Sequence, residues 1–289
     1  MSTSLEGFIG KIMVVLVIYE QHLEDSPAFN SLHAALKPFD KTSSVFIYDN
    51  SAESQLFREK NWDSITYVHD SSNGGVSKAY NNAFEKASAI GKEWLLFTDQ
   101  DTVFPEHFFI QCLEAINKNT HTKIFIPIVK DERGIVSPFR FTLGKGMRAH
   151  NVKPGTTSLL RWNFINSGLL ISTKLFKKSG GYDERFQLDF TDLSFHKRLT
   201  HHVYQMHIVD VCCKHSLSSN QKKSANDALK RFYLYGHSSR VFSRVYHNYF
   251  TLVVMFLRSI KLSFKYLTIQ FVKAGLNFLF IKKQSKHLL

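Results

Sequence analysis

Short apolar runs alternate with helical patterns through the first half of this 289-residue chain. Each apolar run has the length of one strand, and a helical stretch can carry the chain back across a sheet to the next strand. Such alternation implies a largely parallel sheet with crossover helices, which is an α/β fold. The predicted strands cover residues 12–19, 45–48, 65–68, 94–98, 123–129 and 203–211, and the predicted helices cover residues 76–90, 105–117 and 193–199. Residues 130–160 are rich in glycine and proline, and we expect an extended or mobile loop there.

Two carboxylates follow one of these strands directly. Asp99 and Asp101 come after the apolar run at residues 94–98. Open α/β sheets bind ligands at the carboxyl ends of their strands, and carboxylate oxygens suit Mg²⁺ and Mn²⁺. We therefore expect a metal-assisted nucleotide site, although many surface turns also contain two aspartates at this spacing.

Further polar motifs occur in a fixed order along the chain. The landmarks are Asp49-Asn50-Ser51, Asn73-Gly74-Gly75, Asp99-Gln100-Asp101, Asn166-Ser167-Gly168, and Asp192 with Arg198. In this order and spacing, the chain resembles the family-two inverting glycosyltransferases of the GT-A fold, and more narrowly their bacterial rhamnosyltransferase-like branch. The resemblance covers residues 12–240.

The resemblance implies a GT-A (Rossmann-like) fold with a mostly parallel sheet flanked by helices. It also implies inverting transfer of a sugar from a nucleotide-diphosphate donor, with Mn²⁺ or Mg²⁺ as the cofactor. The donor is expected to be a dTDP- or UDP-sugar, with dTDP-rhamnose as the first candidate. Arg231-Phe232-Tyr233 resembles an Arg-x-Tyr-Tyr stretch of that branch, but Gly236-His237 stands where Arg-Asn usually follows, which leaves the donor sugar open.

Several residues are candidates for holding the metal and the nucleotide. Asp101 is the expected direct metal ligand, and by resemblance Asp99 contacts the donor ribose, or the metal through water. The resemblance also implies that Asp49 hydrogen-bonds the nucleotide base, whereas a simple turn is the alternative for Asp-Asn-Ser. His215 is a further candidate for the metal or the diphosphate, and an ordinary surface histidine is its alternative.

The Asn73-Gly74-Gly75 motif precedes the predicted helix at residues 76–90. Its functional interpretation is a close approach of the backbone to the donor, with Lys78 or Asn82 facing the pocket. A tight turn at the entry to the helix explains the motif equally well.

The reaction also needs a general base for the acceptor hydroxyl. By resemblance, this base is the aspartate six residues before an arginine, which is Asp192 before Arg198. Asp192 is expected at a helix start, where a carboxylate also serves as a cap, and Asp189 is the rival for the catalytic role. On the acceptor side we place Trp162, Asn166, Ser167 and Gly168, because an indole beside a small-residue turn can stack on a sugar ring; a core tryptophan is the alternative.

The end of the chain has a different composition. Asp227 is the last acidic residue, and eleven of the thirteen net positive charges follow it. Cations and large apolar residues such as Phe256, Phe264 and Phe271 are interleaved there, in two helices expected to break near Gly275. Either the helices lie on an anionic bilayer or their apolar face packs on the catalytic part.

These observations predict a catalytic domain at residues 1–227 and a basic amphipathic helical tail at residues 228–289. Three cysteines make no disulfide framework, and the start lacks a convincing secretory signal, so we expect a cytoplasmic protein, peripheral on the inner face of the plasma membrane. The expected acceptor is a saccharide, lipid-linked, for a surface polysaccharide such as O-antigen or capsule, and no nucleic acid is expected. The alternatives are a nucleotidyltransferase of similar fold, or a membrane-surface or nucleic-acid binding protein without turnover.

Overall fold

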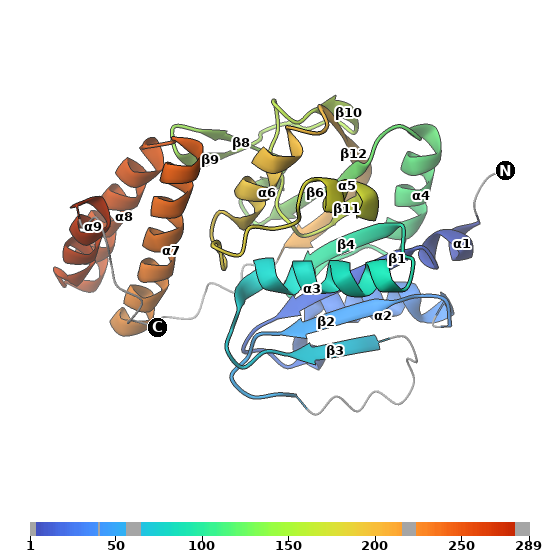
Figure 1. The fold of residues 1–289 in the computed structure, drawn as a ribbon, viewed down its shortest axis with the longest axis horizontal. Coiled ribbons are helices and arrows are strands. Elements are labelled where there is room, and N and C mark those ends of the chain that lie inside the picture. The colour runs from blue at the N-terminus through green and yellow to red at the C-terminus, as the bar shows by residue number, and fades with distance from the viewer. Residues whose placement is uncertain (1–3, 40, 56–64, 216–223, 281–289) are drawn as a thin grey trace.

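The structure is a computed structural model that describes residues 4–39, 41–55, 65–215 and 224–280. The first half of the chain forms the parallel part of a central sheet (Figure 1). Its strands are β1 (Ile12–Ile18), β2 (Val45–Asp49), β3 (Ile65–His69) and β4 (Trp94–Asp99). They pair in parallel in the order β4-β1-β2-β3, as the alternation along the sequence predicts.

The second half of the chain continues this sheet with strands of both directions. These strands are β5 (Thr102–Val103), β6 (Ile124–Asp131), β7 (Gly134–Ser137), β10 (Gly155–Ser158), β11 (Leu169–Ser172) and β12 (Gln205–His215). The described strands give the order β10-β12-β6-β11-β4-β1-β2-β3, with β5 on β12 and β7 on β6. Because β11 runs antiparallel to both β4 and β6, the sheet is mixed.

The segment at residues 130–160 is more ordered than we predicted. Its glycines and prolines suggested an extended or mobile loop, but the chain there forms β7, β10 and a separate hairpin of β8 (Phe139–Thr142) and β9 (Lys145–Arg148). Gly144 lies in the tight turn of this hairpin and has a positive φ, which glycine adopts without steric cost. The prediction of a loop was therefore wrong, because the turn residues join short strands.

Helices cover both faces of the sheet. On one face lie α1 (Leu5–Ile9), α2 (Pro27–Leu36) and α4 (Phe108–Lys118), and on the other lie α3 (Gly75–Ala89), α5 (Thr173–Lys178) and α6 (Thr191–Leu199). Single turns of 3-10 helix at Leu23–Asp25 and Lys37–Phe39 flank α2.

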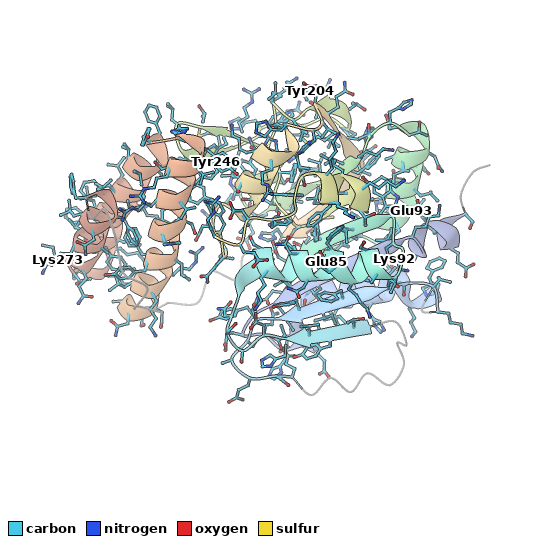
Figure 2. The ribbon with its side chains drawn as sticks, in the orientation of Figure 1. Glu85, Lys92, Glu93, Tyr204, Tyr246 and Lys273 are labelled. Carbon is cyan, nitrogen blue, oxygen red and sulfur yellow. The ribbon has the colours of Figure 1, made fainter. Side chains whose placement is uncertain are left out.

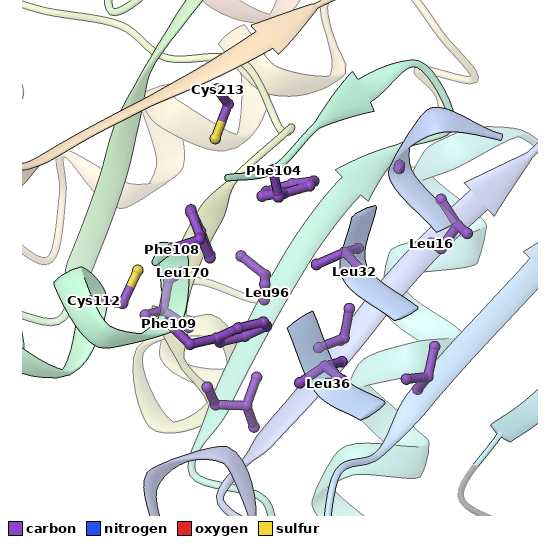
Figure 3. Close-up of a cluster of buried hydrophobic side chains, with 14 of the residues drawn as sticks. Leu16, Leu32, Leu36, Leu96, Phe104, Phe108, Phe109, Cys112, Leu170 and Cys213 are labelled. Atoms are coloured by element: carbon purple, nitrogen blue, oxygen red, sulfur yellow. The ribbon is translucent and has the colours of Figure 1, made fainter. Parts of the chain in front are cut away.

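Strand β1 shows why both faces must be covered. All seven of its residues are buried, and its side chains alternate between the two cores. Leu16 packs with Leu32 and Leu96 in the core that Figure 3 shows, whereas Val15 packs with the residues beneath α3. Burial on both faces is typical of parallel strands and explains the uninterrupted apolar run in the sequence.

The chain ends in a helical extension beside the sheet (Figure 1). It contains α7 (Ala225–Tyr246), α8 (Phe250–Tyr266) and α9 (Gln270–Phe280). Phe232 and Phe242 of α7 share one buried cluster with Phe186 and Phe190 of the loop before α6. The extension is therefore packed against the α/β part of the chain, while Lys273 marks its outer side (Figure 2). The domain boundary expected after residue 227 falls in the first turn of α7 and stays a prediction.

The apolar residues of the extension divide between the two alternatives. Phe271 is fully buried against α7, as packing on the rest of the chain requires, whereas Phe264 is 77% exposed. The expected break near Gly275 was wrong. The helices do not break near Gly275, which lies within α9 and packs against Ser259; the chain instead leaves α8 at Leu267, in a left-handed conformation. Lys282, Lys283 and Lys286 lie outside the described residues, and among the described helices none is long and apolar enough to cross a membrane.

The packing of α9 can be tested by a pair of substitutions. Phe271→Ala should lower the free energy of unfolding by about 3–5 kcal/mol, because it leaves a cavity in a buried cluster. Phe264→Ala on the same helical pair is the matched control and should change it by less than about 0.5 kcal/mol. Denaturant unfolding of both variants measures the difference, and equal effects would contradict the docking of α9.

Candidate active site

Asp99 is held rigidly at the carboxyl end of β4. Its Oδ1 accepts a hydrogen bond of 3.0 Å from the Tyr80 hydroxyl of α3, and its Oδ2 accepts one of 2.8 Å from Ser167 Oγ. Ser167 Oγ also accepts the backbone N–H of Asp99. Burial, together with the negative charge of Asp99, holds the pKa of Tyr80 well above its usual value, so the phenol stays a donor.

The Asn166-Ser167-Gly168 turn links Asp99 to the start of α6. Asn166 Oδ1 accepts a hydrogen bond of 2.7 Å from the Tyr182 hydroxyl, and its amide donates to Thr191 Oγ1 at 3.4 Å. Asn166 and Ser167 are only 7% and 1% exposed. The structure thus shows these two residues supporting the neighbouring carboxylates, and their direct contact with an acceptor stays a prediction.

Gly168 completes this turn for a steric reason. Its φ is +85°, and a Cβ at this position would lie 2.4 Å from Cγ of Pro127. Only glycine therefore fits between β4 and β6 at this point, and the close approach lets Ser167 reach Asp99.

Asp101 and His215 are brought together from distant parts of the sequence. Strand β5 pairs with the end of β12, with Thr102 opposite His215. Asp101 Oδ1 lies 3.3 Å from His215 Nδ1, and Thr102 Oγ1 lies 3.0 Å from the same nitrogen. Burial raises the pKa of Asp101 to about 6; His215 opposes this shift and the charge of Asp99 adds to it.

This arrangement fits a divalent cation shared with a ligand. Among the described residues, no group of three histidine, cysteine or acidic side chains is positioned to hold a metal by itself. Mg²⁺ and similar cations, however, often take only one or two carboxylates and complete their shell with water and substrate phosphates. Asp101, with Asp99 close enough to raise its pKa, supplies such carboxylates, and His215 stands beside them.

Asp49 lies at the carboxyl end of β2 and is fully buried. Its two oxygens accept hydrogen bonds from the backbone N–H of Ser51 at 2.9 Å and from the Tyr67 hydroxyl at 2.6 Å. Burial, with added hydrogen bonding to Asp49, raises the pKa of Tyr67 to about 12. The carboxylate is thus oriented at the ligand-binding edge of the sheet, and its contact with a nucleotide base stays a prediction.

The other donor-binding candidates are placed less directly. Lys78 forms an ion pair of 2.8 Å with Asp70, and this pair holds the pKa of Asp70 well below its usual range. Asn73 is exposed, with a φ of 49°. Asn82 is exposed and donates to the Lys78 carbonyl of its own helix. Asn82 lies two residues after Tyr80, whose hydroxyl binds Asp99. Because residues two apart lie on different sides of a helix, the Asn82 side chain points away from Asp99.

Asp192 stands in the first turn of α6 and is partly exposed. Its Oδ1 accepts the Leu193 N–H at 2.8 Å. Burial raises the pKa of Asp192 to about 7; the hydrogen bond opposes this shift, and the charges of Asp99 and Asp189 add to it. Within the part of the chain that the structure describes, Asp192 makes no ion pair, so it remains available to accept a proton near neutral pH.

Asp189, the rival base, has a different environment. Arg231 of α7 binds it through both guanidinium nitrogens, one of them at 2.8 Å. Both oxygens of this carboxylate are engaged by one arginine in charge-assisted hydrogen bonds, a strong and geometrically specific contact. The structure therefore distinguishes the two aspartates by their partners.

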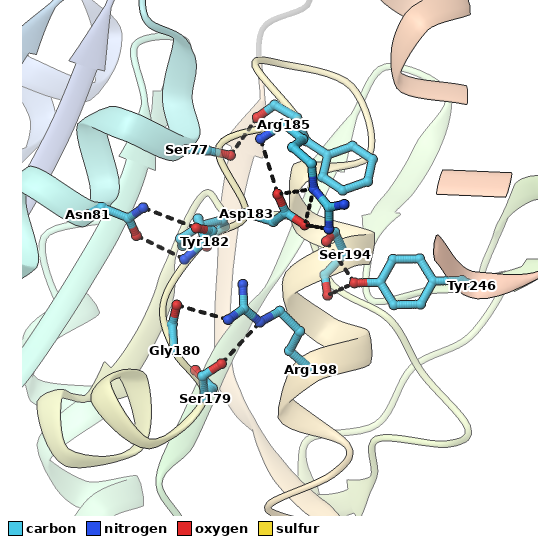
Figure 4. A network of polar contacts seen from close by, with 11 residues as sticks. Ser77, Asn81, Ser179, Gly180, Tyr182, Asp183, Arg185, Ser194, Arg198 and Tyr246 are labelled. Carbon is cyan, nitrogen blue, oxygen red and sulfur yellow. Dashed lines mark hydrogen bonds and ion pairs between the residues drawn. The ribbon is translucent and has the colours of Figure 1, made fainter. Parts of the chain in front are cut away.

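The loop before α6 contains functional support that the sequence did not reveal. Asn81 of α3 accepts the N–H and binds the carbonyl of Tyr182, and Tyr246 of α7 contacts Ser194 of α6 (Figure 4). Arg198, whose spacing identified Asp192, donates to the carbonyls of Ser179 and Gly180. Arg198 thus ties α6 to the turn at Ser179 and Gly180. This structural role explains why an arginine stands six residues after Asp192, and it requires no contact between Arg198 and a substrate.

Trp162 lies apart from the carboxylates. It is buried, and the guanidinium carbons of Arg140 and Arg161 lie 5.1 and 5.5 Å from its ring centroid. Its carbonyl contacts Nε2 of His196, whose pKa burial lowers to about 4. The tryptophan is thus part of the core and of a basic surface beside it.

Comparison with known structures agrees with this fold. The chain is similar to S. aureus TarS 1-349 in complex with UDP-GlcNAc, with a TM-score of 0.55 and 16% identity over 93% of this chain and 80% of that one. It is also similar to the mannosyltransferase PcManGT from Pyrobaculum calidifontis in complex with GDP-Man and Mn²⁺, with a TM-score of 0.56 and 12% identity over 94% and 88% of the two chains. In a longer TarS structure, the chain spans 44% of the protein. At these identities the likeness shows a GT-A fold and no more.

Sequence comparison identifies the family. The chain is 27% identical over 218 residues to the dTDP-rhamnosyl transferase RfbF of Shigella flexneri, which is 73% of this chain and 71% of that protein. The family model described as glycosyl transferase family 2 matches residues 27–177, more than half of the chain. The chain therefore belongs to glycosyl transferase family 2.

Proposed function

We propose that this protein is a metal-dependent, inverting glycosyltransferase that moves a sugar from a nucleotide diphosphate to a saccharide acceptor. One observation carries the proposal: Asp99 and Asp101 after β4, and Asp192 at the start of α6, lie close enough for the charge of Asp99 to act on both other carboxyls. They do so at the carboxyl edge of the sheet, where such sheets bind ligands. The similarity to a dTDP-rhamnosyl transferase favours dTDP-rhamnose as the donor.

The donor would bind across the strand ends. Asp49, whose carboxylate accepts a hydrogen bond from Tyr67, would accept the imide N–H of a thymine or uracil ring. Asp101 would hold a bound Mn²⁺ or Mg²⁺, with Asp99 and His215 beside it; such a cation neutralises a departing diphosphate as a Lewis acid. The structural similarity to a mannosyltransferase solved with Mn²⁺ is consistent with this cofactor.

Asp192 would act as the general base. It removes the proton of the acceptor hydroxyl as that oxygen attacks the anomeric carbon from the side opposite the diphosphate. The bond from the anomeric carbon to the diphosphate oxygen breaks, the nucleoside diphosphate leaves, and the configuration inverts. A carboxyl with a pKa of about 7 accepts a proton far more readily than one at its ordinary value.

The acceptor would be a lipid-linked saccharide for a surface polysaccharide, used at the cytoplasmic face of the membrane. The support is the outer surface of the helical extension, where α8 and α9 meet. Phe264, Leu267 and Ile269 are 77%, 92% and 63% exposed there, and Lys261, Lys265 and Lys273 lie on the same two helices. Exposed apolar side chains among cations fit an anionic lipid surface.

A panel of nucleotide sugars tests the donor and the metal together. dTDP-rhamnose with Mn²⁺ should raise the melting temperature of the protein, because a ligand that binds only the native state stabilises it. Asp101→Ala should abolish the Mn²⁺-dependent part of this shift, since the cation loses its carboxylate. Glu93→Ala, a surface carboxylate at the opposite end of β4, is the control. Unchanged metal dependence in Asp101→Ala would remove the metal assignment.

The base assignment makes a prediction about pH. The transfer rate should fall about tenfold per pH unit below about 7, because protonated Asp192 cannot accept a proton, and it should level off above that pH. Asp192→Asn should cut the turnover by at least ~10²-fold at pH 8 with little change in donor binding. Asp189→Asn is the comparison, and it should keep the pH dependence. If Asp189→Asn alone loses that dependence, the two roles are reversed.

Vesicle binding tests the location. The full-length protein should sediment with anionic vesicles at low salt and be partly released by salt, since each lysine near the surface contributes about 1 kcal/mol. Replacing both Phe264 and Leu267 by serine should weaken sedimentation, whereas Ile90→Ser, an exposed apolar residue after α3, should leave it unchanged. Equal sedimentation of all three proteins would rule out this attachment surface.

A further inference from the structure

A second basic region lies within the catalytic part of the chain. Residues 133–182 contain nine lysines and arginines and no acidic residue. Five of the nine lie on or next to the β8–β10 segment: Arg140, Lys145, Arg148, Lys153 and Arg161. The near-neutral charge of residues 1–227 as a whole conceals this concentration of positive charge.

Most of these cations lack a protein counter-ion. Arg148 pairs with Asp131 at 2.6 Å. Among the described residues, no other lysine or arginine of residues 133–182 has a carboxylate within the 4.0 Å of an ion pair. Arg140 and Arg161 lie against the Trp162 ring instead, so their charges remain available to a ligand.

Part of this basic region surrounds a cavity of about 360 Å³. Its walls combine two cations, Lys153 and Arg161, with polar groups from Asn151, Thr156 and Thr157, beside the Trp162 ring. Guanidinium and ammonium groups bind phosphate or carboxylate oxygens, and hydroxyl and amide groups bind sugar hydroxyls. None of the described residues that line the cavity is acidic.

The cavity lies on the same face of the sheet as Asp99. Ile208 of its wall pairs with Ile126 of β6, and the pairing of Leu170 with Phe125 puts Leu169 beside Ile126. Leu169 in turn pairs with Phe97, two residues before Asp99. Three strand spacings separate Ile208 from Phe97, or about 14 Å, and both side chains belong to the core beneath α3. Asp99 lies two residues, or about 7 Å, beyond Phe97 along β4, and a saccharide of a few units is long enough to reach from this wall to Asp99.

We propose that this cavity, defined by Asn151–Thr157, Arg161 and Trp162, is a remote acceptor subsite that binds an anionic group on the saccharide. The group is a phosphate or a carboxylate carried by a sugar a few units from the reacting hydroxyl. This inference rests on the proposed function, because it assigns the substrate class on the acceptor side of the same reaction. The acceptor chain would then be held at two points, by its anion in the cavity and by its hydroxyl at Asp192.

The experiment is a titration of the full-length protein with three monosaccharides at constant ionic strength. Glucose 6-phosphate and glucuronic acid carry the two kinds of anion, and glucose is the neutral control. Chemical-shift mapping should show glucose 6-phosphate or glucuronic acid, and not glucose, perturbing the backbone amides of Thr156 and Thr157. The arm that binds more tightly identifies the anion.

Variants then locate the contact. The double substitution Lys153→Ala with Arg161→Ala should weaken binding of the anionic sugar at least tenfold. Lys145→Ala removes an exposed lysine of the same basic region outside the cavity, and should change the affinity less than twofold. Equal weakening by Lys145→Ala would indicate a diffuse charge effect and overturn the subsite. Chemical-shift changes in the unmodified protein that do not include residues 151–157 would also overturn the subsite. That measurement does not depend on whether any variant folds.

Donor binding separates this inference from the proposed function. The double variant should keep the thermal shift given by the nucleotide sugar with Mn²⁺, because the cavity is remote from Asp101. If the unmodified protein binds the donor but no anionic sugar at residues 151–157, only the subsite is wrong. If it binds no nucleotide sugar at all, the proposed function is wrong, and the acceptor subsite that rests on it is wrong as well.

Discussion

The antiparallel pairing of β11 with β4 is the constraint on which the candidate site depends. It brings the Asn166-Ser167-Gly168 turn directly beside the end of β4, so that Ser167 can hold both the side chain and the backbone N–H of Asp99. From the same turn, Asn166 reaches Tyr182 and Thr191 at the start of α6. Buried hydrogen bonds of this kind are costly to break, since each lost partner leaves an unsatisfied polar group. The positions of Asp99 and Asp192 are thus fixed by one turn.

The electrostatics of the site follow from this closeness. Four carboxylates, those of Asp99, Asp101, Asp189 and Asp192, form a series in which neighbouring charges interact, and burial raises the pKa values of Asp101 and Asp192. An acidic cluster without counter-ions is unfavourable in a protein interior. Arg231 neutralises Asp189 at one side of the cluster, and a bound cation would neutralise the side near Asp101. Positive charge placed near Asp101 would therefore be electrostatically favoured.

Much of the fold could be predicted from the sequence, because buried parallel strands leave uninterrupted apolar runs such as residues 12–18 and 94–97. The strand-end carboxylates followed from the same logic. The supporting residues could not be predicted: Tyr80 and Tyr182 are indistinguishable from core aromatics in the sequence, and the partners of Ser167 and Asn166 lie 68 and 16 residues away. The exposure of Phe264 and burial of Phe271 likewise depend on how α9 folds back onto α7, which helical periodicity alone does not determine.

The ion pair between Arg231 and Asp189 has a consequence for how such a chain can vary. Arg231 is on α7, and Asp189 is on the loop that leads to the candidate base. Each residue added to or removed from α7 ahead of Arg231 rotates the guanidinium by about 100° about the helix axis, away from its partner. The rotation of α7 about its axis is therefore fixed by the loop before α6, both by this ion pair and by Phe242 further along the helix. A change of chain length is tolerable only outside this stretch of α7, as in the segment that precedes the helix.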